Sequence, residues 1–190
     1  MVERAKRPTL LLEKKRYTYR DYLSFPDDGY TYQIIDGEVF MAPAPSPYHQ
    51  RISRNIEFIL WRFVSERGLG EVLDAPCDVV LSEENVVQPD LLFISRERLS
   101  IIGEASVNGP PDLVVEIISP STETLDREVK RRLYERFGVK EYWVVDPERR
   151  EIEIWLLREG RFELYGRFGP GQTLTSPVLK GLEFEVGEVF

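Results

Sequence analysis

The sequence predicts a mixed α/β fold, in which a central sheet of mixed strand direction is flanked by helices. Three observations predict it. Apolar residues recur at helical spacing over about 47–67, short apolar runs typical of strands follow, and a second helical pattern at about 125–137 leads into another strand. The order helix, three strands, helix, strand favours packing of both helices against one sheet.

A short helix and a hairpin are predicted first. Thr18 and Asp21 have the spacing of a capping box, which marks the first turn of a helix. Strand-like runs then flank Asp36-Gly37, a dipeptide that favours the tight turn of a hairpin. We expect these elements at residues 18–42.

The first long helix has clear signals at both ends. Ser46 is a good N-cap, Pro47 suits the first helical position, and Gly68 ends the pattern. Between them an apolar stripe recurs at steps of three and four residues, formed by Ile52, Ile56, Ile59, Leu60 and Phe63. The stripe predicts an amphipathic helix with one face against the sheet.

Strands are predicted from residue 71 onward. Strand-like runs lie at 71–74, at 77–81, directly after Asp90 and at 112–119, with a polar turn at 82–85 and a short helix near 96–102. A strand at 141–145 follows the second helix, and the tail has strand-like runs at 152–157, 161–165 and 182–186.

We predict a single domain over 1–190, with a core of about 46–146, the N-terminal helix and hairpin at 18–42, and a C-terminal β extension at 151–190. The composition, 42% hydrophobic and 31% charged, fits one globular domain with an ordinary core. The apolar runs are too short to span a membrane. The chain has a single cysteine, Cys77, which excludes a framework of internal disulfides and a cysteine-based zinc site. We expect a cytoplasmic protein.

Glu116 stands in the middle of an otherwise apolar strand. An isolated ionised carboxylate there is strongly unfavourable unless it is paired or bound to a metal. Asp90 stands at the start of another apolar run. Two carboxylates from neighbouring strands are what a divalent-cation site for phosphodiester chemistry needs, and hard oxygen ligands suit Mg²⁺ or Mn²⁺.

The second helix carries two stripes. Leu125, Val129, Leu133 and Phe137 recur every four residues and predict the core face, while Asp126, Lys130 and Tyr134 form a polar stripe beside it. A residue that borders the core face can extend along the sheet. We therefore expect Lys130 to reach the carboxylate pair, with a solvated helix position as the alternative.

Further candidate catalytic residues are His49, in the first turn of the long helix, and Glu38, after the Asp36-Gly37 turn. A lone histidine is more often a structural group, and Glu38 fits an exposed strand position as well as a third acid. Asp112 reads as the first residue of its strand and Asp126 as a residue that favours a helix start.

The net charge of −8 argues against a simple nucleic-acid coat protein. Lysine and arginine gather in residues 1–20 and 127–140. These segments could bind phosphates if they lie together. Otherwise their charge only keeps the protein soluble.

A set of motifs in order resembles a known family. Pro89-Asp90 and the Glu116 strand on this layout are similar to the PD-(D/E)xK nuclease superfamily. Closer resemblance, to the Uma-type family of restriction-endonuclease-like proteins, lies in Ile34–Glu38, Pro45–Gln50, Asn85–Asp90, Asp112–Glu116, Ser119–Thr122, Lys130–Tyr134 and Gly138–Pro147. The short acidic pattern is weak, whereas the ordered set, over about 18–157, is much more specific.

The resemblance implies an αβββαβ restriction-endonuclease-like core and metal-dependent DNA cleavage, with Asp90 and Glu116 holding Mg²⁺. It also implies a lysine two residues after the second acid, where this chain has Ile118. Lys130 is the first lysine after Glu116, so we expect the lysine to have moved to the helix. The other readings are activation of water by the metal alone and an inactive site.

Three hypotheses follow: a Mg²⁺-dependent DNA nuclease, an inactive nuclease-derived module that binds nucleic acid or protein, and an unrelated intracellular domain. The resemblance also implies a homodimer, because cutting both strands of a duplex generally needs two active centres.

Overall fold

The structure is a computed structural model that describes residues 15–190. Its helical segments are α1 (Tyr19–Tyr22), α2 (Pro47–Arg67), the 3₁₀ turn η1 (Arg96–Ile101), the π-helical turn η2 (Leu125–Lys130), α3 (Arg131–Phe137) and the 3₁₀ turn η3 (Val186–Glu188). Within this range, no helix has both the length and the apolar character needed to cross a membrane.

Its strands are β1 (Thr31–Ile35), β2 (Glu38–Ala42), β3 (Gly70–Asp74), β4 (Val79–Ser82), β5 (Asn85–Val87), β6 (Leu91–Ser95), β7 (Val107–Asn108), β8 (Leu113–Ile117), β9 (Glu141–Asp146), β10 (Glu151–Arg158), β11 (Arg161–Phe168), β12 (Thr173–Thr175) and β13 (Glu183–Glu185).

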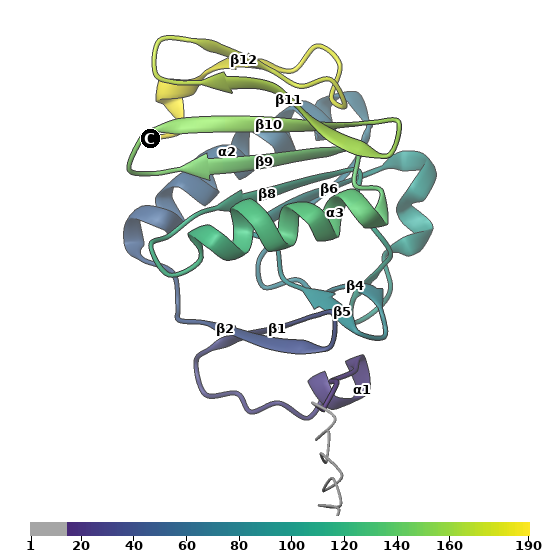
Figure 1. The fold of residues 1–190 in the computed structure, drawn as a ribbon. Helices are drawn as coiled ribbons and strands as arrows, with labels where there is room; N and C mark the ends of the chain where they lie inside the picture. Colours follow the sequence, from purple (N-terminus) through teal and green to yellow (C-terminus); the bar gives the residue numbers. More distant parts are fainter. Residues whose placement is uncertain (1–14) are drawn as a thin grey trace, which may run out of the picture.

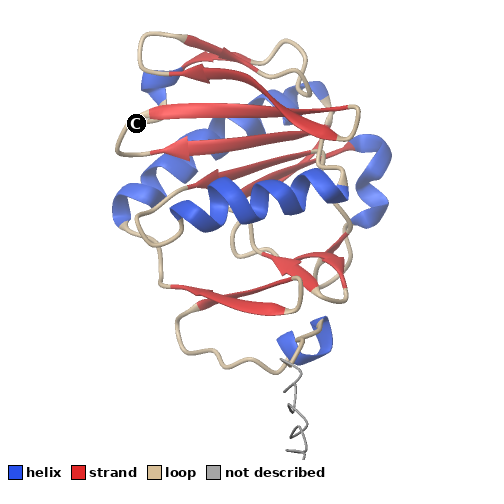
Figure 2. Ribbon diagram, in the orientation of Figure 1, coloured by secondary structure: helices blue, strands red, loops and turns tan. Residues whose placement is uncertain are grey.

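The main sheet has the spatial order β11-β10-β9-β8-β6-β3, with α3 across one face and α2 against the other (Figures 1 and 2). β8 and β9 run parallel because η2 and α3 form the crossover between them, whereas the other neighbours are antiparallel. The chain order α2, β3, β6, β8, α3, β9 is the predicted αβββαβ core. The predicted fold class, mixed α/β with a mixed sheet between helices, is confirmed.

α2 has the predicted ends. The Ser46 hydroxyl accepts the backbone N–H of His49 at 3.2 Å, and Pro47 begins the helix. Gly68 ends it with φ 60°, a left-handed conformation that glycine adopts without a side-chain clash. The predicted apolar stripe is buried against the sheet.

The second helix differs from the prediction. It begins with the π-helical turn η2, and its most buried side chains are Asp126, Lys130, Leu133 and Tyr134. Three residues of the predicted core face, Leu125, Val129 and Phe137, are only partly buried. The reason is geometric: a π turn bonds residue i to i+5, so it shifts the phase of the helix against the sheet. The polar stripe therefore faces inward.

A second sheet, in the order β2-β1-β5-β4-β7, was not predicted. The predicted strand at 77–81 became β4 of this sheet, and the predicted turn at 82–85 is shorter, because β5 begins at Asn85. β1 joins β5 through Ile34 opposite Val86. Strands this short have no clear local pattern, and their partners lie far away in the sequence.

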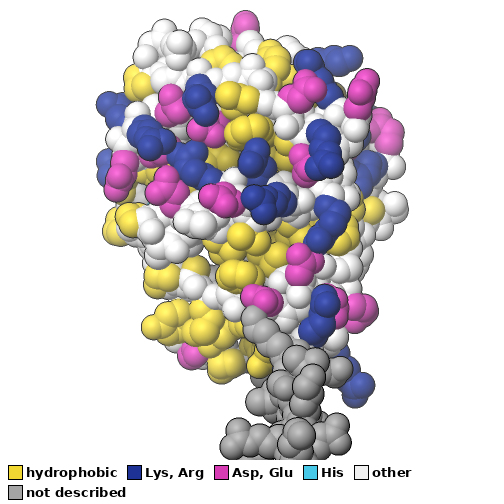
Figure 3. Space-filling view, in the orientation of Figure 1, with side chains coloured by type: hydrophobic (Ala, Val, Ile, Leu, Met, Phe, Trp, Pro, Cys, Tyr) yellow, Lys and Arg dark blue, Asp and Glu magenta, His cyan; other side chains and the backbone are white. Residues whose placement is uncertain are grey.

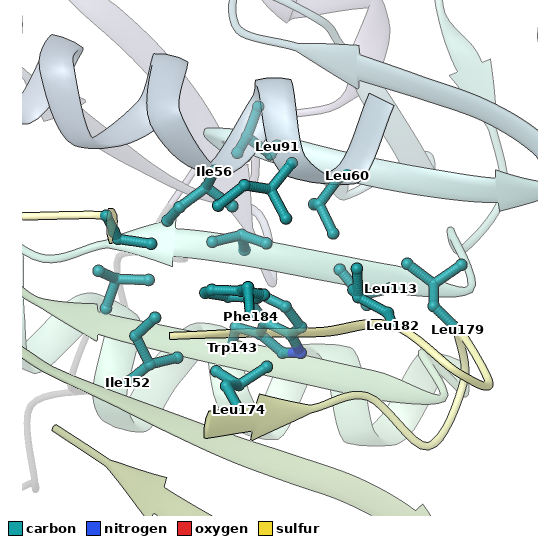
Figure 4. Packing of buried hydrophobic residues seen from close by; sticks show 14 of the residues in the cluster. Ile56, Leu60, Leu91, Leu113, Trp143, Ile152, Leu174, Leu179, Leu182 and Phe184 are labelled. Atoms are coloured by element: carbon teal, nitrogen blue, oxygen red, sulfur yellow. The ribbon is translucent and has the colours of Figure 1, made fainter. Parts of the chain in front are cut away.

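The C-terminal segment contributes to the main core. Side chains from the turns and strands after β11, including Leu174, Leu182 and Phe184, pack around Trp143 of the main sheet (Figure 4). The centroids of the Trp143 and Phe184 rings lie 6.1 Å apart. One hydrophobic cluster thus extends from Ile52 of α2 to Val189 near the C-terminus.

Candidate active site

A cleft of about 970 Å³ opens where the N-terminal end of α2, the end of β8 and η2 meet. Its lining includes His49, Asp90, Glu116, Asp126 and Lys130. Four segments, α2, the residues before β6, β8 and η2, therefore deliver titratable side chains to one place.

The pairing of β6 with β8 positions the two acids. Leu91 lies opposite Val115 in the antiparallel ladder, so one further step places Asp90 opposite Glu116. A carboxylate oxygen of Asp90, Oδ2, accepts the backbone N–H of Ile117 at 2.7 Å. The two predicted metal-binding acids thus lie on adjacent chain segments and line the same cleft.

Glu116 is almost completely buried, with a side chain that is 4% exposed. Burial raises the pKa of Glu116 to about 8, and the charges of Asp126 and Asp90 act in the same direction, while Lys130 acts against them. The hydroxyl of Tyr134 donates to Glu116 Oε1 at 2.7 Å. Glu116 is therefore a carboxyl group that gains strongly from a nearby positive charge.

Lys130 supplies such a charge. Its Nζ lies 2.9 Å from Glu116 Oε1 and 3.1 Å from Asp126 Oδ1, and its side chain is only 3% exposed. Burial acts to lower the pKa of Lys130, but the carboxylates of Asp126 and Glu116 more than offset this effect and raise it. The ammonium group is therefore held in its charged form.

His49 of α2 contacts the end of β8 and the residue before β6. Its Nε2 lies 3.0 Å from the carbonyl oxygen of Ile117 and 3.3 Å from Asp90 Oδ2. Burial lowers the pKa of His49, but Asp90 and the Ile117 carbonyl raise it above its usual value. An N–H at Nε2 that is shared between these oxygens fixes the orientation of the Asp90 carboxylate.

Asp126 belongs to the cleft. The sequence predicts it as a residue of the helix start, yet its buried carboxylate lies beside Lys130 and lines the cleft. Burial raises the pKa of Asp126, and the Lys130 charge acts against this rise. The signal that could have found it, together with Tyr134, is the stripe at residues 126, 130 and 134.

Other candidates lie elsewhere. Glu38 is exposed at the end of β2 next to the hairpin turn, whereas the opposite end of β2, at Ala42, borders the cleft. The structure does not bring Glu38 to the other site residues. Asp112 is buried at the opposite end of β8, where it pairs with Arg98 at 3.1 Å and Lys140 at 2.6 Å, as expected for a structural residue at a strand start.

Ile118, the residue at the position where the superfamily has its lysine, packs in the hydrophobic cluster beneath α3. The lysine contact to Glu116 comes instead from the helix, through Lys130. Whether Lys130 takes the place of the lysine of the superfamily stays a prediction, as does its catalytic role.

The basic segment 127–140 has mostly paired charges. Arg127 contacts Asp146 and Glu153, Arg136 contacts Asp36, and Lys140 contacts Asp112. The surface over α3 shows Lys and Arg interspersed with Asp and Glu (Figure 3). Most of the other basic segment, residues 1–20, lies outside the described residues.

The chemistry of the site fits a divalent cation. Asp90, Glu116 and Asp126 stand against the Lys130 ammonium and the His49 imidazole, a formal excess of two negative charges when all carboxylates are ionised and His49 is neutral, and of one when His49 is protonated. Mg²⁺ characteristically uses one or two carboxylates and completes its shell with water or phosphate. Over residues 15–190, no three His, Cys, Asp or Glu side chains are already arranged around one point, so the fit is to an open site.

Comparisons with known proteins agree with this fold. A crystal structure described as that of a "putative nuclease belonging to DUF820" from Anabaena variabilis superposes with a TM-score of 0.76 at 16% identity, over 91% of this chain and 97% of that chain. This likeness shows a nuclease-like fold. No curated protein matches the chain. The model of the Uma2 family, described as "Putative restriction endonuclease", matches residues 19–187, so the chain belongs to the Uma2 family.

Proposed function

We propose that this chain is a divalent-metal-dependent endonuclease that hydrolyses phosphodiester bonds of DNA. The observation that carries the proposal is the contact of Lys130 Nζ with Glu116 Oε1 at 2.9 Å inside the cleft. Asp90, Glu116 and Lys130 thus line one cleft, although in the superfamily the lysine lies on the strand and here it comes from a helix. The family description and the name of the Anabaena variabilis protein point to the same class of reaction.

Each residue has a role in this proposal. Asp90 and Glu116 would hold Mg²⁺ or Mn²⁺, and His49 would keep the Asp90 carboxylate oriented toward the cleft. The bound cation would polarise the phosphate and make a water molecule more acidic. In the hydrolysis, the water oxygen bonds to phosphorus, one ester P–O bond breaks, and a proton passes to the leaving oxygen.

Lys130 stabilises the negative charge that develops on the phosphate oxygens. When a cation engages Glu116, Asp126 remains as the partner of the Lys130 ammonium, at 3.1 Å in the structure. Asp126 is thus a positioning residue in this proposal: it keeps the ammonium charged and directed at the cleft.

The test is cleavage of supercoiled plasmid by the wild type, Asp90→Asn and Glu116→Gln in the presence of Mg²⁺ or Mn²⁺. We expect the wild type to nick or linearise the plasmid and both variants to lose nearly all activity. Arg132→Gln, an exposed change on the same helix, is the matched control and retains activity. Equal cleavage by the wild type and Glu116→Gln removes the proposal, because the activity then comes from a contaminant.

Calorimetric titration separates the site from the reaction. Binding of Mg²⁺ or Mn²⁺ to the wild type, and its loss in Asp90→Asn and Glu116→Gln, supports the assignment of the two acids as ligands. A homodimer stays a prediction, which sedimentation of the free protein and of its DNA complex would test.

The alternative function is an inactive, nuclease-derived binding module. Two observations favour it: Ile118 stands where the superfamily has its lysine, and the net charge of the chain is −8. A salt-dependent shift of DNA mobility without cleavage under any divalent cation would support this alternative.

A further inference from the structure

The outer face of α2 carries an unusual stripe. Arg51, Arg54, Phe58, Trp61 and Arg62 are all exposed, and they recur at steps of three and four residues along the helix. Residues three and four apart lie on one face of an α-helix. We call these five residues the α2 stripe. Most exposed aromatics of a soluble protein occur singly, whereas Phe58 and Trp61 are neighbours, 56% and 54% exposed.

The stripe is basic as well as aromatic. Three arginines belong to it, and the acids Glu57 and Glu66 lie outside it at its two flanks, as the helical spacing of 100° per residue requires. The guanidinium carbon of Arg62 lies 5.3 Å from the centre of the Phe58 ring, over its face. An arginine held against an aromatic face keeps the N–H groups at its edge free to donate to a phosphate.

The stripe leads to the candidate active site. Its first turn lies beside Tyr48, whose ring contacts Arg51 at 5.2 Å, and both Tyr48 and Arg54 line the cleft. From residue 51 to residue 62 the helix rises by roughly 16 Å. Stacked nucleotides rise by about 3.4 Å each along the strand axis, so the stripe has the length of roughly five stacked nucleotides.

We propose that the α2 stripe binds a single strand of nucleic acid and guides it into the cleft. Bases stack on Trp61 and on the Phe58–Arg62 pair, and phosphates accept hydrogen bonds from Arg51, Arg54 and the edge of Arg62. Aromatic platforms combined with a basic track are the usual means of binding single strands without sequence preference. Binding of a single strand to the stripe does not depend on the proposed nuclease function. Delivery of that strand into the cleft does rest on it.

A second copy of this chain fits the stripe less well. A symmetric pair of antiparallel α2 helices centred on Phe58 would bring Arg54 of one copy close to Arg62 of the other. No acid stands within the stripe itself, and Glu57 and Glu66 lie only at its flanks. Like charges that face each other across an interface oppose association, whereas a phosphate chain complements them.

The test measures binding in EDTA, where metal-dependent cleavage cannot contribute. Fluorescently labelled single-stranded DNA, single-stranded RNA of the same sequence and duplex DNA are titrated with the full-length wild type. We expect a single strand to bind more tightly than the duplex, with quenching of tryptophan fluorescence, and the DNA and RNA arms identify the preferred strand.

Phe58→Ala/Trp61→Ala tests the stacking platform. We expect it to lose about tenfold or more in affinity for the single strand, since each stacked base contributes appreciably. Arg51→Gln/Arg54→Gln/Arg62→Gln is expected to bind more weakly and to show a shallower dependence of affinity on salt. Leu164→Ala/Tyr165→Ala, an exposed pair on β11, is the matched control and keeps wild-type affinity.

Several results would overturn the inference. One is single-strand affinity that is unchanged in Phe58→Ala/Trp61→Ala while circular dichroism shows an intact fold. Another is a wild-type dimer in sedimentation that this variant makes monomeric, because a second copy then covers the stripe. Loss of plasmid cleavage alone would not affect it: a wild type that binds single strands through the stripe but never cuts refutes the nuclease proposal and leaves the binding surface.

Discussion

At the scale of single residues, the buried charges of the cleft determine what the site can do. The Lys130 ammonium lies between Glu116 and Asp126, and all of these side chains are nearly inaccessible to water. A buried ion pair adds little net stability over an apolar pair, but removal of one partner leaves uncompensated charge and is costly. Glu116 and Asp126 therefore depend on a positive charge beside them, which Lys130 supplies in the structure.

Lys130→Met tests this balance. We expect a loss of about 3 kcal/mol in the free energy of unfolding without divalent metal, because Glu116 and Asp126 lose their counter-charge. We expect Mg²⁺ to restore part of that loss, since a ligand that binds only the folded state stabilises it. Urea unfolding with and without Mg²⁺ measures both effects.

The control for this change is Arg132→Met, an exposed substitution on the same helix, which should alter stability little. Stability of Lys130→Met equal to that of the wild type, with no response to Mg²⁺, would contradict the assignment of Lys130 as the counter-charge of the site.

Asp112 gives a prediction on pH away from the cleft. Burial raises the pKa of Asp112, but Lys140, the backbone N–H of Ser95 and Arg98 lower it more, so that the pKa lies below the ordinary 3.8. A carboxyl with a lower pKa in the folded state contributes stability above the unfolded pKa and loses it as pH falls through the folded pKa.

We therefore expect Asp112→Asn to be destabilised by about 1–2 kcal/mol near neutral pH, because its hydrogen bonds to Lys140, Arg98 and the Ser95 N–H lose the carboxylate charge while both cations stay accessible to water. The difference from the wild type should shrink as pH falls below about 4. Urea unfolding of both proteins at a series of pH values measures the difference, and a gap that stays constant over the whole acid range would be evidence against this role.

How far the sequence predicts the site depends on the residue. Glu116 could be found because a carboxylate in an apolar strand is unfavourable without a partner, and Asp90 because it stands directly before another apolar strand. Asp126 could not be weighted correctly, because its burial depends on the π-helical turn that shifts the helix phase. The distance of Glu38 from the cleft depends on the placement of the hairpin, which no local pattern encodes.

At the scale of elements, α2 shows what local sequence can specify. Its predicted limits match those of the structure because a cap, a proline and a glycine mark its ends, and its apolar stripe has one consistent phase. β5, β7 and β12 were missed because runs of two or three residues carry no detectable period. Their pairing comes from partners elsewhere in the chain.

Ser46→Ala tests the link between the α2 cap and the site. The Ser46 hydroxyl accepts the N–H of His49, so its loss should cost about 1 kcal/mol in the free energy of unfolding. The same change should loosen the first turn, where His49 holds Asp90, and so weaken Mg²⁺ binding. Ser65→Ala, an exposed change in the last turn of α2, is the control.

Chemical unfolding and calorimetric titration of both serine variants measure these effects. Equal stability of Ser46→Ala and Ser65→Ala would mean that the cap does not hold the helix start. Reduced stability of Ser46→Ala with unchanged metal affinity would separate the cap from the orientation of Asp90.

At the scale of the whole molecule, the sequence predicts the order of the core helices and strands better than it predicts which segments pack into the hydrophobic core. The αβββαβ layout could be read along the chain, whereas the second sheet and the closure of the core by the tail join segments far apart in sequence. The sequence predicts residues 151–190 as a β extension added to a core at about 46–146. In the structure its apolar side chains share one cluster with α2 and the main sheet (Figure 4).

Phe184→Ala tests whether the tail and the main sheet unfold together. Phe184 is 7% exposed and packs near Trp143, so truncation should cost about 3–5 kcal/mol, as for a residue in the middle of a core. Leu23→Ala, at a position that is 67% exposed, should change stability by less than about 0.5 kcal/mol.

Because the cluster is continuous, far-ultraviolet circular dichroism and tryptophan fluorescence should report one transition at one denaturant concentration in the wild type and in both variants. An earlier separate fluorescence transition, with a loss of less than about 1 kcal/mol in Phe184→Ala, would instead mean that the tail folds onto a core that is already complete.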